Sequence, residues 1–515
     1  MLFNQRAGNV NRQPIFLTGT LLLLALGASA QTTAQPPPAV HDDLLMDALI
    51  KKGILTQAEA QSIESGVALQ ETNGASAAAT APAFKLPNSM ESMQLYGDVR
   101  LRYEYRGEDN LPGAGPSTFY RERFRYALRL GIRGDLYDQF NYGIRLETST
   151  NPRSPWATFG SNGTAGSVTP SDKSGSGINV GQLFIGWHPE TWFEATAGRM
   201  PMPLYTTPMV WDSDINPEGA FEKFKLATDN VDWFADFGQF DYQDPSSSSA
   251  FPSTDIFVLA WQAGGVVKID TNKSFKIAPV LYTYTGQGYS SASSPTGLNA
   301  PFVGQGKNGA NVGVPGSSYQ SGYNEQGIND LLVLEIPAEF DFPIPTTVFG
   351  NLQGRLFGDF GYNIDGNERA RAAYNANPAA FPGLNGPATG QDLSYQVGFG
   401  IGSAGPVYGP TQGLVYGSTA KKNTWESRVY WQHVEQYAQD VNLLDSDFFE
   451  GRGNLEGIYT SFAYSFTDAI IGTIRYGYAS RIDGQLGTGG NNLDLPSLNP
   501  VQNYNIFQVD LTWRL

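Results

Sequence analysis

The chain has 515 residues, a formal net charge of −16 and no cysteine, and it is rich in glycine (59), phenylalanine (30) and tyrosine (26). The absence of cysteine excludes disulfides and thiolate metal sites, and the acidic balance argues against a nucleic-acid partner, which needs a basic surface. The mean hydropathy of −0.29 is low for a helical membrane protein, but it suits a barrel in which only alternate residues are apolar.

Residues 1–30 have the pattern of a secretory signal peptide. Arg6 and Arg12 precede an apolar run over 15–26, and Ala28-Ser29-Ala30 forms a small-x-small cleavage site. The competing interpretation is an uncleaved anchor, but the run is short for a membrane span. No later run of eighteen apolar residues occurs, so we expect a mature chain that crosses the inner membrane and leaves it.

Residues 31–87 are predicted to form a periplasmic region with a proline-rich tether, a pair of short helices and a low-complexity linker. The helices are expected over 42–50 and from Thr56 through Val67, where Thr56 and Glu59 have capping-box spacing. Two functions remain open for this helical pair: an interaction or trimer-assembly element, or a solvated appendage.

Strand-like segments begin at Met93 and continue to the C-terminus, which predicts an all-β domain over residues 88–515. The sixteen predicted strands are 93–106, 118–133, 139–149, 178–188, 191–199, 218–227, 230–241, 254–269, 273–284, 328–342, 346–362, 391–402, 423–437, 454–466, 469–481 and 503–515. The count could lie between 14 and 18. In particular, 403–422 is long where a short turn is expected, and a missed hairpin there would make eighteen strands.

The second of these strands has two chemically distinct faces. Even positions from Phe124 to Ile132 are apolar or aromatic, whereas the odd positions carry five arginines, namely Arg121, Arg123, Arg125, Arg129 and Arg133. The strand is long enough to cross a bilayer when tilted. The connections between strands alternate between short turns and long loops rich in Gly, Ser, Pro and Asn, which is the pattern of outer-membrane barrels. We therefore predict a closed transmembrane barrel of about 16 antiparallel strands.

The segments Gly198–Pro203 and Val210–Ala220 resemble a porin family of Gram-negative outer membranes. Its members share a strand that ends in Gly-Arg, a proline-containing turn and a Trp-Asp-x-Asp-x-Asn-Pro-Glu-Gly stretch, present here at Trp211–Gly219. Asp47–Thr56, Leu136–Asp138 and Gly143–Thr148 are also similar to the family. The resemblance implies a passive diffusion channel, often trimeric, in outer-membrane lipid.

A cationic wall is the first candidate functional feature. Arginine facing lipid near the midplane costs about 2–4 kcal/mol, so the arginine faces are expected to point into the lumen. The predicted pore-lining residues are Arg100, Arg102, Arg121, Arg123, Arg125, Arg129, Arg133, Arg145 and Glu147. Such a wall could attract anions. Alternatively, its arginines could pair with lumen carboxylates, although Glu104 and Glu147 alone are too few to neutralise it.

An acidic loop is the second candidate. In sixteen-stranded porins the third external loop commonly folds into the lumen, so the resemblance predicts a constriction containing Arg199, Asp212, Asp214 and Glu218. An acidic loop opposite a basic wall would place a transverse field across the pore. The alternatives are a calcium site or simple capping of the next strand.

An enzyme is not expected, and no cofactor or metal is implied. The three histidines are His41, His188 and His433, and none has a neighbouring nucleophile in a recognisable motif. We therefore predict a porin for small hydrophilic solutes or ions, with a preference for anions if the arginine wall is not neutralised. The alternatives are a surface receptor or adhesin barrel that binds ligand through its long loops, and a soluble sugar-binding all-β protein.

Overall fold

The computed structural model describes residues 89–110, 118–137, 139–149, 154–160, 177–244, 255–285, 330–346, 351–376, 384–403, 421–488 and 501–515. The predicted signal peptide, tether, helical pair and linker (1–87) lie outside these residues, as does most of 403–422. No helix in the part of the chain that the structure describes is long and apolar enough to cross a membrane.

The described residues form one antiparallel sheet that closes on itself. Its strands are β1 (Gln94–Asn110), β2 (Thr118–Leu136), β3 (Phe140–Thr148), β4 (Ala157–Thr158), β5 (Ile178–Glu190), β6 (Phe193–Arg199), β7 (Glu218–Ala227), β8 (Val231–Gln243), β9 (Ile256–Asp270), β10 (Lys273–Ile277), β11 (Val280–Tyr284), β12 (Leu332–Glu335), β13 (Ala338–Pro345), β14 (Asn351–Asn363), β15 (Leu393–Gly402), β16 (Trp425–Val434), β17 (Leu455–Ser465), β18 (Ile470–Arg481) and β19 (Val501–Arg514). Two short helices accompany them, α3 (Gly366–Ala376) and the 3-10 turn Phe449–Gly451.

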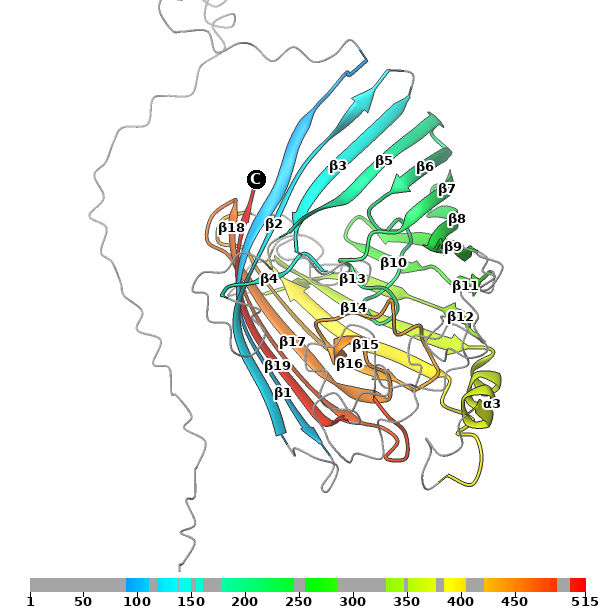
Figure 1. Cartoon of the computed structure of the whole chain (residues 1–515). Helices are drawn as coiled ribbons and strands as arrows, with labels where there is room; N and C mark the ends of the chain where they lie inside the picture. The colour runs from blue at the N-terminus through cyan, green and yellow to red at the C-terminus, as the bar shows by residue number, and fades with distance from the viewer. Residues whose placement is uncertain are drawn as a thin grey trace, which may run out of the picture. The chain divides into compact units, whose positions relative to one another are not determined.

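Closure occurs between the first and last strands. Leu101 of β1 lies opposite Leu511 of β19 on one side and opposite Tyr126 of β2 on the other. Each further strand pairs antiparallel with its neighbours in the wall, as the ring of ribbons in Figure 1 shows. The predicted closed antiparallel barrel is therefore confirmed.

Two of the predicted strands are interrupted. The predicted strand 273–284 is divided into β10 and β11 at Ala278-Pro279, and 328–342 is divided into β12 and β13 at Ile336-Pro337. Proline has no N–H to donate to a ladder, which explains both breaks. The short β4 is an inserted piece that pairs with β2 beyond the end of β3. With each broken pair counted as one strand, the described residues make a wall of sixteen, as predicted.

The alternative of eighteen strands in the wall is wrong. Tyr395 of β15 lies opposite Phe360 of β14 and also opposite His433 of β16. Both edges of β15 are therefore occupied, which leaves no place for two further strands between β15 and β16.

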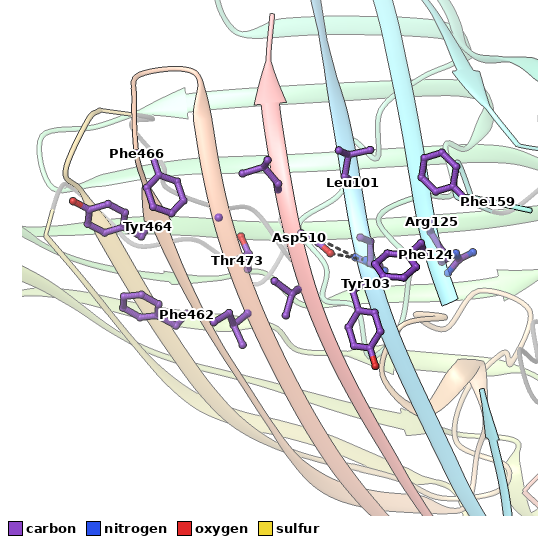
Figure 2. A pocket seen from close by; sticks show the side chains of 15 residues that line it. Leu101, Tyr103, Phe124, Arg125, Phe159, Phe462, Tyr464, Phe466, Thr473 and Asp510 are labelled. Carbon is purple, nitrogen blue, oxygen red and sulfur yellow. Dashed lines mark hydrogen bonds and ion pairs between the residues drawn. The ribbon is translucent and has the colours of Figure 1, made fainter. Parts of the chain in front are cut away.

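The two faces of the wall differ chemically, as the alternation predicts. Outward-facing side chains are large and apolar, including Leu101, Phe124, Leu356 and Val397. Aromatic side chains, among them Trp187, Trp192, Trp233 and Trp513, are exposed on the same outer face. An apolar hollow of about 610 Å³ lies on this face, over β17, β18, β19, β1 and β2. Figure 2 shows the side chains that line it.

We predict that Leu356→Arg lowers the free energy of unfolding from lipid vesicles by about 2–4 kcal/mol, because it places a guanidinium against hydrocarbon. Leu356 is 51% exposed in the middle of β14, between Phe340 and Phe399. Leu356→Ala is the control, since it removes the same side chain without adding charge. Equal unfolding free energies for the two variants in a urea titration would contradict an outer face in contact with lipid.

Candidate functional site: the lumen and its two inward-folded loops

The arginines of β1, β2 and β3 share the inner face of the wall. Arg102, Arg123, Arg125 and Arg129 are buried there, and Arg121 is half-buried on the same face. Arg133 is exposed at the short-turn end, where it donates to Gln94 at 3.0 Å. The alternation of β2 accounts for this placement, because the intervening Phe124 and Leu128 are exposed on the outer face.

Carboxylates from the same wall contact several of these arginines. Glu104 of β1 is fully buried and accepts from Arg106 at 3.1 Å and from Arg123 at 2.7 Å. Asp510 of β19 accepts from Arg102 at 2.8 Å. Further pairs join Arg100 to Asp98 at 2.6 Å and Arg145 to Glu147 at 2.9 Å. The wall is therefore a network of ion pairs rather than an uncompensated positive surface.

A loop over residues 200–217 crosses from β6 to the opposite side of the barrel. Backbone groups of Tyr205 exchange two hydrogen bonds with the side chain of Gln262 in β9, at 2.9 and 2.8 Å. Thr206 donates to Glu335 of β12 at 2.7 Å, and the Thr207 hydroxyl donates to Asp359 of β14. The loop is therefore anchored to three separate wall strands, through its backbone at β9 and through side chains at β12 and β14.

The three acidic residues predicted to form a cluster in this loop each have a different partner. Asp214 forms an ion pair with Arg129 of β2, so the acidic loop does meet the arginine wall. Glu218 pairs with Arg199 at the base of the loop, at 2.8 Å. Asp212 is buried and instead accepts from the backbone N–H of Ser446 at 3.1 Å. The residues predicted for the constriction therefore lie near one another in the chain but do not form one cluster.

A second loop, residues 435–454, also occupies the lumen. Its Asp447 accepts from Arg102 at 2.9 Å and from Arg106 at 3.2 Å. Its Asp440 accepts from the hydroxyls of Tyr242 and Tyr284, both at 2.8 Å, on β8 and β11. The loop therefore bridges β1 to wall strands well separated from it in the ring.

The turn Phe449–Gly451 brings a further carboxylate to the arginines. Phe449, Glu450 and Gly451 have φ values of 68°, 54° and 66°, a left-handed conformation that is uncommon outside glycine. Glu450 is fully buried and lies 3.3 Å from both Arg106 and Arg452. The buried ion pairs of Glu450 thus offset the unfavourable conformational free energy of this left-handed turn.

The two inward loops bind each other and enclose an apolar core. The backbone N–H of Asp445 donates to the carbonyl of Pro208 at 3.1 Å. Trp211 packs edge-on against Phe240 at 5.9 Å, and Phe448 lies 5.1 Å from Tyr459, measured between ring centroids. These contacts bury the aromatic side chains, so this part of the lumen is closed to solvent. Desolvation there, together with the charges of Asp212 and Asp447, raises the pKa of the Asp445 carboxyl well above its ordinary value.

Trp156, just before β4, completes the arginine network. The Arg102 guanidinium carbon lies 3.9 Å from the Trp156 ring centroid, and that of Arg125 lies 5.7 Å away. Cation–π contacts of this kind favour a desolvated guanidinium.

Sequence reasoning did not identify Trp156, Asp447, Glu450 or Asp510 as partners of the arginines. The available signal was the acidic and aromatic run Asp445-Ser446-Asp447-Phe448-Phe449-Glu450, which is unusual for a solvated loop. Asp510 does not lie in a run of this kind, because it occupies an ordinary inward-facing position of the last predicted strand.

His433 of β16 lies apart from the arginine network of the lumen. His433 lies on the outer face, with its ring stacked on Tyr395 at 4.8 Å and its Nδ1 atom 2.9 Å from Glu456. No cluster of three or more metal-ligating side chains occurs in the described ranges, so the alternative of a calcium site at Asp212, Asp214 and Glu218 gains no support.

Comparison with known proteins agrees with the resemblance noted from the sequence. A family model described as "Putative porin" matches residues 112–300. Among solved structures, an anion-selective porin from Comamonas acidovorans matches with 10% identity and a TM-score of 0.37, over 82% of this chain and 99% of that one. A triple mutant of the Rhodopseudomonas blastica porin matches with 10% identity and a TM-score of 0.35, over 82% and 100%. A search of curated proteins finds no match.

We predict that Asp447→Ala lowers the free energy of unfolding by about 1–3 kcal/mol, because it removes one of the two carboxylates that the buried Arg102 and Arg106 share, while Glu104 still contacts both. The control is Asp232→Ala, which removes an exposed pair with Lys268 and should cost no more than about 1 kcal/mol. Urea unfolding of the refolded protein in detergent micelles measures both. Similar losses in the two variants would show that the network does not hold loop 435–454.

Proposed function

We propose that this chain is an outer-membrane porin through which small hydrophilic solutes diffuse down their gradients without a catalytic step. The observation that carries the proposal is the closed sixteen-strand wall with an apolar outer face and a charged inner face. Such a wall fits a bilayer around a polar interior. The family match over residues 112–300 supports the same function.

The cellular setting follows from the same proposal. A cleaved signal peptide at 1–30 would deliver the chain across the inner membrane, and residues 31–87 would remain in the periplasm. The barrel would sit in outer-membrane lipid, most naturally as a homotrimer, as the family resemblance implies. The proposal includes no nucleic-acid partner.

Ion selectivity would depend on paired charges more than on unpaired arginines of the wall. Arg100 with Asp98, Arg129 with Asp214, and Arg145 with Glu147 place opposite charges side by side along the inner face. Adjacent opposite charges act as local dipoles whose fields decay faster than that of a single charge. We therefore expect an anion preference that is weak, with polar solutes oriented by these dipoles.

A receptor or adhesin barrel is the second candidate function. It is favoured by one observation: the loops 200–217 and 435–454 cross the lumen and pack an apolar core within it. A lumen obstructed in this way would conduct little, and the long external loops would then carry the function by binding a ligand.

Single-channel recording in planar bilayers distinguishes the two functions. A porin should give stable conductance steps and a reversal potential that is slightly anion-selective in a salt gradient. Arg129→Gln should shift the reversal potential toward cations, and Asp214→Asn should shift it toward anions, because each removes one charge of the same pair. Absence of conductance steps from an inserted, folded barrel would support the receptor.

Glu122→Gln serves as the control for these recordings. Glu122 is exposed on the outer face of β2, so its charge should not influence ions inside the lumen. A shift in this control equal to that of Asp214→Asn, or unchanged reversal potentials in both lumen variants, would contradict the proposed origin of selectivity.

A further inference from the structure

The apolar hollow on the outer face is a trough between two aromatic ridges. One ridge belongs to β17 and the turn after it, namely Phe462, Tyr464 and Phe466. The other lies over β1 and β2, namely Tyr103, Phe124 and Phe159 (Figure 2). The floor between the ridges is aliphatic, with Ile474 of β18 opposite Val509 of β19 and Leu511 of β19 opposite Leu101 of β1. A flexible apolar chain lying in this trough would make dispersion contacts on several sides.

A glycine in β18 sets the shape of the trough at its β17 side. Gly472 lies opposite Tyr464 on one side and opposite Leu511 on the other. A Cβ atom at this position would lie 2.7 Å from the ring atom Cε2 of Phe466, which is too close for a real contact. The Phe466 ring therefore leans over the β18 backbone, and a larger side chain at position 472 would displace it.

The length of the trough suits a single acyl chain. It crosses β17, β18, β19, β1 and β2, which are consecutive neighbours in the sheet. With neighbouring strands about 4.8 Å apart, the distance from the first of these strands to the last is about 19 Å. The hydrocarbon core of a bilayer is about 30 Å thick, so the chains of one leaflet extend about 15 Å. The two lengths are comparable.

Two lysines lie at the β17 end of the trough. The hydroxyl of Tyr464 donates to the side chain of Asn423 at 3.0 Å, and Lys421 and Lys422 immediately precede Asn423 in the chain. Both lysines are exposed beside the short turn that follows β17, where the backbone N–H of Lys422 donates to Asp468 at 2.7 Å. The basic pair and the aromatic ridge are therefore adjacent.

The ammonium groups of this pair are available to a ligand. Neither Lys421 nor Lys422 forms an ion pair with any residue that the structure describes. Lys268 and Lys273, at the short turn between β9 and β10, are instead paired with Asp232 and Asp270. Lysines at a membrane surface attract the phosphate groups of anionic lipids. The short turns of an outer-membrane barrel face the periplasm, so the headgroup would belong to the periplasmic leaflet.

We propose that the trough binds an acyl chain of an anionic phospholipid whose phosphate contacts Lys421 and Lys422. This inference rests on the proposed function, since it requires the barrel to lie in a membrane. The concave face is not complementary to a copy of itself, and the basic pair favours a negatively charged partner. The position of the lysines at the short-turn end favours a lipid of the periplasmic leaflet over one of the opposite leaflet.

Native mass spectrometry of the full chain in detergent, titrated with phosphatidylglycerol or phosphatidylcholine, tests the headgroup contact. The unaltered chain should bind phosphatidylglycerol more tightly. The double substitution Lys421→Ala with Lys422→Ala should weaken phosphatidylglycerol binding about tenfold and remove the preference, because it deletes two attractive charges. Lys268→Ala with Lys273→Ala is the matched control, since these lysines already have carboxylate partners, and should leave the preference intact. Equal affinities for phosphatidylglycerol before and after the Lys421 and Lys422 substitutions would overturn the proposal.

A second variant tests the trough itself. Val509→Trp fills the floor with a larger apolar side chain and should weaken the binding of both lipids. Val397→Trp on β15, which is outward-facing and outside the trough, should leave binding unchanged. Unchanged lipid binding by Val509→Trp overturns the proposal, and loss of an oligomer in that variant without loss of lipid would assign the trough to a second copy instead.

The inference and the proposed function can fail separately. A barrel that conducts in planar bilayers but shows no preference for phosphatidylglycerol overturns this inference alone. A chain that is extracted without detergent overturns the proposed function as well.

Discussion

The pairing of β1 with β19 is the constraint on which the rest of the molecule depends. A strand edge in hydrocarbon has no partner for its N–H and C=O groups, so only a closed sheet is stable there. Here the first and last described strands meet along most of their length, with Asp98 opposite Arg514 and Tyr105 opposite Phe507. Once the sheet is closed, alternation alone assigns each side chain to the lumen or to the outer face.

Closure also brings the arginines of the inner face close together, and the two inward loops supply carboxylates that pair with them. A ring of strands with arginine on its inner face holds several guanidinium groups within a confined space, and each must keep a partner because arginine does not lose its proton. Wall carboxylates such as Glu104 and Asp510 supply part of the compensation, and loop carboxylates such as Asp447 and Glu450 supply more. The loops are thereby held in the lumen by the charges they neutralise.

The same loops bring apolar side chains into a space that a simple pore would leave wet. Trp211 and Phe448 pack against wall aromatics, so part of the lumen resembles a protein core. The apolar core meets the charged face at β1, where Arg106 donates to the hydroxyl of Tyr504 at 3.3 Å. In the proposed porin, solutes would meet ordered dipoles in a narrowed passage.

The sequence by itself determined a barrel of about sixteen strands, within a range of 14 to 18, the two faces of the wall and the inward direction of the arginines, because these depend on a local two-residue period and on loop length. It could not determine the partners of those arginines: Arg102 meets Asp447, far along the chain, only after the sheet closes. It likewise could not show that Asp212 and Asp214 have different partners, or that β15 pairs directly with both β14 and β16. Those outcomes depend on which strands become neighbours, and only the tertiary structure decides that.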